Sequence, residues 1–239
     1  MVASQRIAAF VVSGVCLLLA GAVGFAIHSV IAPVNGGAQQ MAKSFTPFTL
    51  PLTFLTRVEG NAPLIMIEFS DFQCPFCGAY ARTTLPQIRE EFIKAGKIRY
   101  AFVHFPLEDL HRDATRAAAA ADCAGRQGLF WQMHDALFQQ QDSLADKDLS
   151  NLSKSVGVNP IPFSTCMAGD DVRLSIEREV EVARKLNVVS TPSFFLGRVV
   201  DDTVQVTGAL SGAHPIGSFR SAINRLMGAE TERVSSSGL

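Results

Sequence analysis

Two cysteines, Cys74 and Cys77, stand in a Cys-Pro-Phe-Cys sequence just after the apolar, β-favouring run 65–69. The residues at 78–92 repeat their apolar side chains at helical spacing. The cysteines are therefore expected where a strand leads into a helix. There, unpaired N–H groups and the helix dipole favour a thiolate on an exposed Cys74. Cys77, one helical turn later, would lie on the same face of the helix and be buried. Two cysteines placed in this way can form and break a disulfide reversibly.

The spacing of these cysteines also occurs in zinc sites and structural disulfides, so the neighbouring residues decide the interpretation. Pro75 suits the first turn of a helix, where its missing N–H costs nothing. Glu68 is the only ionisable residue in the run 64–70. On a central strand it would be buried near the Cys77 sulfur, with a raised pKa, and would accept that thiol's proton. The alternative is a carboxylate on the solvent face of the strand.

A second motif follows much later, where Thr191-Pro192 leads into the apolar residues 193–196. The two motifs, in this order, resemble the thioredoxin superfamily, and specifically the DsbA-like thiol:disulfide oxidoreductases, over residues 45–227. The resemblance implies that Pro192 follows a cis peptide bond and faces the reactive cysteine. It also implies that Thr191 presents its backbone to an extended substrate strand, beside Pro75 and Phe76.

Hydrophobic periodicity predicts the elements around these motifs. A strand at 97–105 completes a βαβ unit. Residues 45–55 are interpreted as an early strand on the core, with a contact to the membrane or a partner as the alternative. The region 107–170 is expected to hold two or three helices, and DsbA-like proteins carry such a helical domain between the halves of the thioredoxin core. Further expected elements are a helix at 171–186, a hairpin of strands at 193–196 and 204–207, and a helix at 218–227. The prediction is an α/β thioredoxin fold at 45–228 with a helical insertion, followed by a flexible tail at 229–239.

An uncharged apolar run at 7–27 follows Arg6 and is long enough at helical rise to cross a bilayer. Residues 1–30 are therefore interpreted as a transmembrane anchor, with a signal peptide cleaved near Ala20-Gly21-Ala22 as the alternative. The charge of Arg6 keeps the amino terminus in the cytoplasm. Behind a linker at 31–44, the rest of the chain would then be extracytoplasmic, in the periplasm or at the cell surface, held at the cytoplasmic membrane or secreted.

Cys16 lies inside the apolar run, which leaves four cysteines and three ways to pair them. We favour a redox pair of Cys74 with Cys77 and a structural disulfide of Cys123 with Cys166 across the helical insertion. A second redox pair and two free thiols are the alternatives for Cys123 and Cys166.

The predicted activity is disulfide exchange, in which Cys74 forms a mixed disulfide with an exported protein and Cys77 or the substrate thiol resolves it. The exported location and the helical insertion favour a disulfide-forming oxidase, which would need a membrane partner of the DsbB or VKOR type. A reductase or isomerase is the alternative, and a reductase would need a DsbD-like donor. The side chain of Phe76 offers a thiolate no hydrogen bond or charge, which argues against very strong oxidising power. The chain is expected to be a monomer.

A metal-binding module is a candidate from another class, because two thiolates can hold Cu(I). None of the five histidines adjoins the Cys-x-x-Cys motif, and His104, His111 and His134 are interpreted as strand-end or helix-surface residues. We expect neither a metal nor another cofactor. A third candidate is a structural protein with a vestigial motif. A formal net charge of -1 gives no sign of a nucleic-acid surface.

Overall fold

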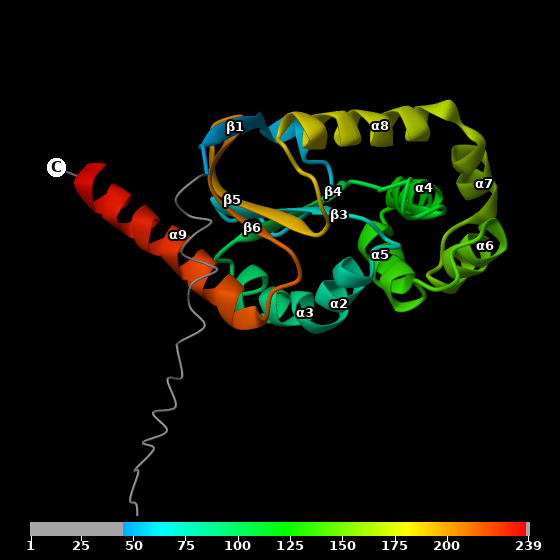
Figure 1. The fold of residues 1–239 in the computed structure, drawn as a ribbon, viewed down its shortest axis with the longest axis horizontal. Coiled ribbons are helices and arrows are strands. Elements are labelled where there is room, and N and C mark those ends of the chain that lie inside the picture. The colour runs from blue at the N-terminus through cyan, green and yellow to red at the C-terminus, as the bar shows by residue number, and fades with distance from the viewer. Residues whose placement is uncertain (1–44, 238–239) are drawn as a thin grey trace, which may run out of the picture. The chain divides into compact units, whose positions relative to one another are not determined.

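A computed structural model describes residues 45–237 of the protein (Figure 1). Its sheet has six strands in the order β1-β6-β5-β3-β4-β2. The strands are β1 (Phe48–Pro51), β2 (Val58–Glu59), β3 (Leu64–Ser70), β4 (Arg99–His104), β5 (Ser193–Val200) and β6 (Thr203–Ser211). The predicted anchor or signal at 1–30 and the linker at 31–44 lie outside the described residues. Within 45–237, no helix combines the length and the apolar character needed to cross a membrane.

The central strand β3 carries the run that leads to the two cysteines. It pairs in parallel with β4 and antiparallel with β5, and all seven of its residues are buried. Burial on both faces explains why this strand is almost continuously apolar in sequence. Glu68 is the exception, and it lies opposite Phe102 on β4 and Phe194 on β5. The predicted early strand is also present, because β1 pairs antiparallel with β6.

Helices cover both faces of the sheet (Figure 1). Helices α2 (Pro75–Thr83) and α3 (Leu85–Ile88), the π-helical turn η2 (Arg89–Ile93) and the first turns of α9 (Ile216–Ser237) pack on one face. Helix α8 (Asp170–Lys185) and the short 3-10 turn η1 (Leu52–Phe54) pack on the other face. The helix that the sequence predicts over 78–92 is thus broken into three pieces. Pro86 explains the break at the start of α3, because proline has no N–H for the helical ladder.

The helical insertion contains four helices, one more than the most that the sequence predicts. They are α4 (Ala114–Gly125), α5 (Phe130–Gln139), α6 (Asp146–Ser155) and α7 (Pro160–Ala168). Helix α7 escapes prediction because it is short and opens on a Pro-Ile-Pro sequence that is typical of a loop. The side chain of Asn159 caps it by accepting the Ile161 N–H at 3.1 Å.

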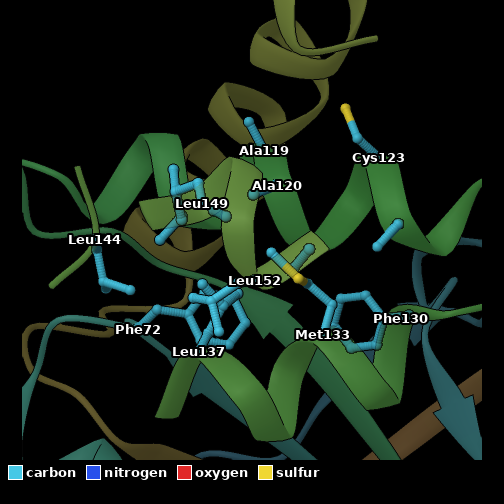
Figure 2. Close-up of a cluster of buried hydrophobic side chains, with 14 of the residues drawn as sticks. Phe72, Ala119, Ala120, Cys123, Phe130, Met133, Leu137, Leu144, Leu149 and Leu152 are labelled. Atoms are coloured by element: carbon cyan, nitrogen blue, oxygen red, sulfur yellow. The ribbon is translucent and has the colours of Figure 1, made fainter. Parts of the chain in front are cut away.

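The core of the insertion is built around the buried alanines of α4 (Figure 2). Side chains from α5 and α6, among them Met133, Leu137 and Leu152, fill the space next to them. Phe72, from the loop before the two cysteines, enters this core, and its ring centroid lies 4.8 Å from that of Phe138. The insertion therefore packs directly against the loop that carries the cysteines.

Cys123 of α4 and Cys166 of α7 form a disulfide, with their Cα atoms 5.7 Å apart. This is the pairing that the sequence favours. At the other end of the chain, α9 continues to Ser237. Residues 229–237 are therefore helical, and the flexibility predicted for the tail at 229–239 stays a prediction.

Candidate active site

The Cys-Pro-Phe-Cys motif lies at the start of α2, as predicted. Cys74 is the residue before the helix, Pro75 is its first residue, and both cysteines are free thiols. Cys77 is fully buried, whereas the side chain of Phe76 projects into solvent. Cys74 is only 4% exposed, so the expectation of an exposed Cys74 is wrong. The loop around Pro192 covers it.

That covering loop contains a cis peptide bond between Thr191 and Pro192. The Cys74 thiol lies 3.4 Å from the Thr191 carbonyl oxygen, to which it donates. The Gly212 N–H donates to the Pro192 carbonyl at 2.7 Å and ties the loop to the end of β6. The Thr191 N–H has no backbone partner within residues 45–237. It is therefore able to pair with an added strand.

The two thiols differ strongly in acidity. A hydrogen bond from the Cys77 thiol, the side chain of Thr191 and the N–H groups of Phe76 and Cys77 lower the pKa of Cys74 to about 5, against the opposing effect of burial. Burial raises the pKa of Cys77 well above its ordinary value, and the hydrogen bond to Cys74 and the charge of Glu68 raise it further. At neutral pH the pair therefore holds a thiolate on Cys74 and a proton on Cys77.

Glu68 is fully buried below the dithiol, so the alternative of a solvated carboxylate is excluded. Burial raises its pKa to about 8, while the Ser70 hydroxyl and the charge of Arg89 act in the opposite direction. The Tyr100 hydroxyl donates a hydrogen bond to Glu68 Oε2. Glu68 Oε1 has no hydrogen-bond partner among the described residues. A carboxyl with this pKa can gain and lose a proton near neutral pH.

Sequence reasoning missed the residues that hold the active-site loop. Buried Asp71 accepts hydrogen bonds from the Gln73 N–H at 2.7 Å and the Leu107 N–H at 2.8 Å, and its Oδ2 lies 2.7 Å from His111 Nδ1. Asp71 thereby joins the loop to the start of the insertion. The spacing of Asp71 and Gln73 is that of an Asx turn, which is a signal present in the sequence.

A second missed residue is Gln141, which follows α5. Its side-chain amide donates to the carbonyls of Phe72 at 2.8 Å and Cys74 at 2.9 Å. Gly78 leaves room for it, because a Cβ at that position would lie 1.7 Å from Gln141 Oε1. No pattern in the sequence marks Gln141, since its role depends on where α5 ends.

The histidines lie only partly as expected. His104 ends β4 as expected, although it is fully buried, whereas His134 is buried within the insertion rather than on a helix surface. His134 packs against aromatic rings, with its ring centroid 5.0 Å from that of Phe102 and 4.9 Å from that of Phe138. Within residues 45–237, no group of three or more His, Cys, Asp or Glu side chains is arranged to hold a metal ion.

A free dithiol at a helix start, opposite a cis-proline and beside a helical insertion, defines the thioredoxin fold in its DsbA-like form. The family model described as thioredoxin matches residues 57–210, and the chain belongs to that family. The fold is also that of alpha-DsbA1 from Wolbachia pipientis, with a TM-score of 0.63 at 23% identity over 74% of this chain and 94% of that one. The predicted DsbA-like resemblance is confirmed.

Two sequence relatives extend this comparison. The chain is 28% identical to the probable disulfide bond formation protein D of Bacillus cereus, over 58% of this chain and 67% of that protein. It is 36% identical to the Na(+)/H(+) antiporter NhaA 3 of Salinispora tropica, over 57% of this chain and 20% of that protein. The chain thus spans about a fifth of the length of the antiporters that it matches.

Proposed function

We propose that the chain is an extracytoplasmic thiol:disulfide oxidoreductase that forms disulfides in exported proteins through Cys74 and Cys77. The observation that carries this proposal is the contrast between the two thiols. A pKa of about 5 keeps Cys74 as a thiolate, while burial keeps Cys77 protonated. A thiolate stabilised in the reduced state makes the reduced protein the favoured product, which is the property of an oxidant.

The exchange follows from this contrast. In the oxidised protein, a substrate thiolate attacks Cys74 Sγ, the bond between Cys74 and Cys77 breaks, and Cys77 leaves with a proton from Glu68. A second substrate thiolate then attacks the substrate sulfur of the mixed disulfide, and Cys74 leaves as a thiolate. The substrate has gained a disulfide, and the protein has gained two electrons.

The cis-proline loop is suited to binding many different protein substrates. The unpaired Thr191 N–H would pair with the backbone of an extended substrate segment, which needs little sequence specificity. The exposed side chain of Phe76, with Pro75 beside it, would supply an apolar contact next to the reacting sulfur.

The proposed location and partner rest on the sequence. The apolar run at 7–27 supports export, either with a retained anchor or with a cleaved signal, and the protein is proposed to act as a monomer. A membrane partner of the DsbB or VKOR type would remove the two electrons after each cycle. The match to antiporters carries no proposal of ion transport, because it covers only a fifth of those proteins.

The test is the equilibrium reduction potential of the Cys74/Cys77 couple, titrated with glutathione on the full chain. We expect a value between that of thioredoxin, about -270 mV, and that of DsbA, about -120 mV. A value at or below about -270 mV would instead identify a reductase.

Trapping the mixed disulfide tests the roles of the two cysteines. Cys77→Ser, with Cys74 first converted to a mixed disulfide with 5-thio-2-nitrobenzoate, should release that thiol and accumulate a mixed disulfide with a reduced, unfolded secreted protein. Cys74→Ser is the matched control and should accumulate none.

A further inference from the structure

The chain contains only two tyrosines, and both are fully buried near Glu68. Tyr100 of β4 donates its hydroxyl hydrogen bond to Glu68 Oε2. Burial raises the pKa of the Tyr80 hydroxyl of α2 and the charge of Glu68 raises it further, but that hydroxyl has no hydrogen-bond partner among the described residues. Two identical groups thus face one carboxyl from different elements, and only one of them is bonded to it.

Arg89 supplies the positive charge on the same carboxyl. Its Nε lies 2.9 Å from Glu59 Oε2, and its Nη1 lies 3.0 Å from both oxygens of Asp135. Its guanidinium also sits over the ring of Trp131, 5.4 Å from the centroid. These contacts hold Arg89 where its charge lowers the pKa of Glu68. Because Trp131 and Asp135 belong to α5, the helical insertion reaches Glu68 through Arg89.

This cluster contains buried polar atoms without partners among residues 45–237. They are Glu68 Oε1, Tyr80 Oη, Arg89 Nη2 and, from α5, His134 Nε2. An isolated buried polar atom is costly, and ordered water is its usual partner. Since Tyr100 occupies Oε2, the other oxygen of Glu68 remains available for the proton of Cys77.

We propose that Tyr100 and Arg89 are positioning residues that keep Glu68 able to exchange a proton with Cys77. Tyr100 fixes the carboxyl through Oε2 and leaves Oε1 free, and Arg89 favours the carboxylate form. When Cys77 attacks the sulfur of Cys74 in a mixed disulfide, Glu68 takes its proton and the substrate leaves as a thiolate. When the disulfide opens, the proton returns to Cys77. No electron passes through Tyr100 or Arg89.

This inference rests on the proposed function, but its first test does not depend on activity. The carboxyl resonance of Glu68 is followed by ¹³C NMR in the reduced full-length protein between pH 5 and 10, and it is assigned by its loss in Glu68→Gln. Tyr100→Phe removes one hydroxyl and keeps the ring, and Tyr80→Phe is the matched control. We expect Tyr100→Phe to raise the pKa of Glu68 by about one unit and Tyr80→Phe to change it by less than about 0.3.

Arginine variants provide a second pair. Arg89→Gln should also raise the pKa of Glu68, since it removes a favourable charge. Arg220→Gln is its control, because Arg220 donates to Glu91 of the same turn η2, at 2.7 Å, and does not contribute to the pKa of Glu68. The arginine pair keeps the inference testable if Tyr100→Phe does not fold.

Kinetics supply the second readout. At pH 7 the rate at which Cys77 resolves a mixed disulfide should fall about tenfold in Tyr100→Phe, because one pKa unit leaves about a tenth as much Glu68 carboxylate. The loss should shrink to about twofold at pH 9 and disappear near pH 10. Equal pKa shifts in Tyr100→Phe and Tyr80→Phe, or an unchanged pKa in Tyr100→Phe and Arg89→Gln, would overturn the inference even in an active protein. A wild-type chain without disulfide exchange would contradict the proposed function instead.

Discussion

The sulfur of Cys74 lies 3.4 Å from the carbonyl oxygen of Thr191, a residue 117 positions further along the chain. This contact brings the two motifs of the sequence to one point, next to the cis bond that follows Thr191. A carbonyl oxygen accepts a hydrogen bond from the thiol but offers none to a thiolate. The charged sulfur is instead stabilised by the Cys77 thiol, the side chain of Thr191 and the N–H groups of Phe76 and Cys77.

The first prediction concerns the pH dependence of alkylation. Iodoacetamide should modify Cys74 of the reduced protein at a rate with a midpoint near pH 5, because only the thiolate reacts. Cys77 should stay unmodified up to at least pH 9, because it is buried and its pKa is raised. Mass spectrometry of quenched time points measures both rates.

Cys77→Ser is the informative variant for this measurement. The hydrogen bond from the Cys77 thiol is the largest contribution to the low pKa of Cys74. A serine hydroxyl can also donate, so the midpoint should stay below pH 7. Cys77→Ala removes the donor, and its midpoint should rise by a unit or more. A wild-type midpoint near pH 8.5, the value of an ordinary thiol, would contradict the lowered pKa.

The second prediction concerns the cost of burying Glu68. The pKa of Glu68 is about 8 in the folded protein and about 4.3 in the unfolded chain. At a solution pH between these two values, folding is therefore accompanied by the uptake of a proton. The unfolded state binds fewer protons there, and the Glu68 contribution makes stability fall as pH rises from 4.5 to 8. Glu68→Gln should therefore raise the free energy of unfolding by up to about 3 kcal/mol at pH 7 and by less than about 1 kcal/mol at pH 5.

Urea denaturation of the oxidised protein measures this gain, because Cys74 and Cys77 do not titrate in a disulfide. The same variant should resolve mixed disulfides more slowly. A variant that is more stable but resolves disulfides more slowly is expected when the replaced residue is a base held in a buried site. A Glu68→Gln variant that is less stable than wild type at both pH 7 and pH 5 would contradict this prediction. It would mean that the hydrogen bonds of Glu68 stabilise the fold by more than its buried charge destabilises it.

The sequence predicts the positions whose environment is set locally. Cys74 and Pro75 are in this class, because a strand run and a helix pattern on either side of them define a helix start. Glu68 is predictable for a related reason, since a lone acid in an apolar central strand has no solvent face. The covering of Cys74 is not predictable, because it depends on the distant Thr191 carbonyl.

Residues outside the motifs acquire their roles from register and packing. The pairing of β4 with β3 places Phe102 opposite Glu68. Tyr100 lies two residues before Phe102, on the same face of the sheet, and its side chain therefore reaches Glu68. No pattern in β4 fixes that register. Arg89 depends on a π-helical turn and on the placement of α5, and neither feature has a signal in the sequence.

The third prediction concerns the disulfide of the insertion. Replacing Cys123 and Cys166 together by serine should lower the free energy of unfolding by about 4 kcal/mol, because the unfolded chain loses a closed loop of 43 residues. Urea denaturation of the oxidised double variant measures the loss. The reduction potential of Cys74/Cys77 should change little, since both replaced cysteines lie outside the redox motif. A shift of more than about 30 mV, which corresponds to 1.4 kcal/mol, would indicate that the two pairs are energetically coupled.

The fourth prediction concerns a buried ion network between the sheet and the insertion. Arg57 pairs with Asp122 of α4 at 2.5 Å and with Glu179 of α8 at 2.8 Å, and the exposed fraction of each side chain is below 15%. His104 Nε2 lies 3.1 Å from the same Asp122 oxygen. Removing one member of a buried ion network leaves uncompensated charge, so Arg57→Met should lower the free energy of unfolding by about 3 to 5 kcal/mol at pH 7.

The pH dependence of this loss follows from Asp122. Burial acts to raise its pKa, but His104 and Arg57 outweigh burial and hold the pKa of Asp122 below its ordinary value. The stability that Asp122 contributes is complete above the unfolded pKa of about 3.9 and is lost as pH falls below it. Without Arg57, protonation of the carboxylates becomes favourable, so the difference between Arg57→Met and wild type should shrink as the pH is lowered from 7 to 4.

Arg173→Met is the matched control, because Arg173 forms its ion pairs on the exposed side of α8 and should change stability by less than about 1 kcal/mol. Equal losses in the two variants, or a loss in Arg57→Met that does not change between pH 7 and 4, would mean that Arg57 acts through packing rather than through its charge.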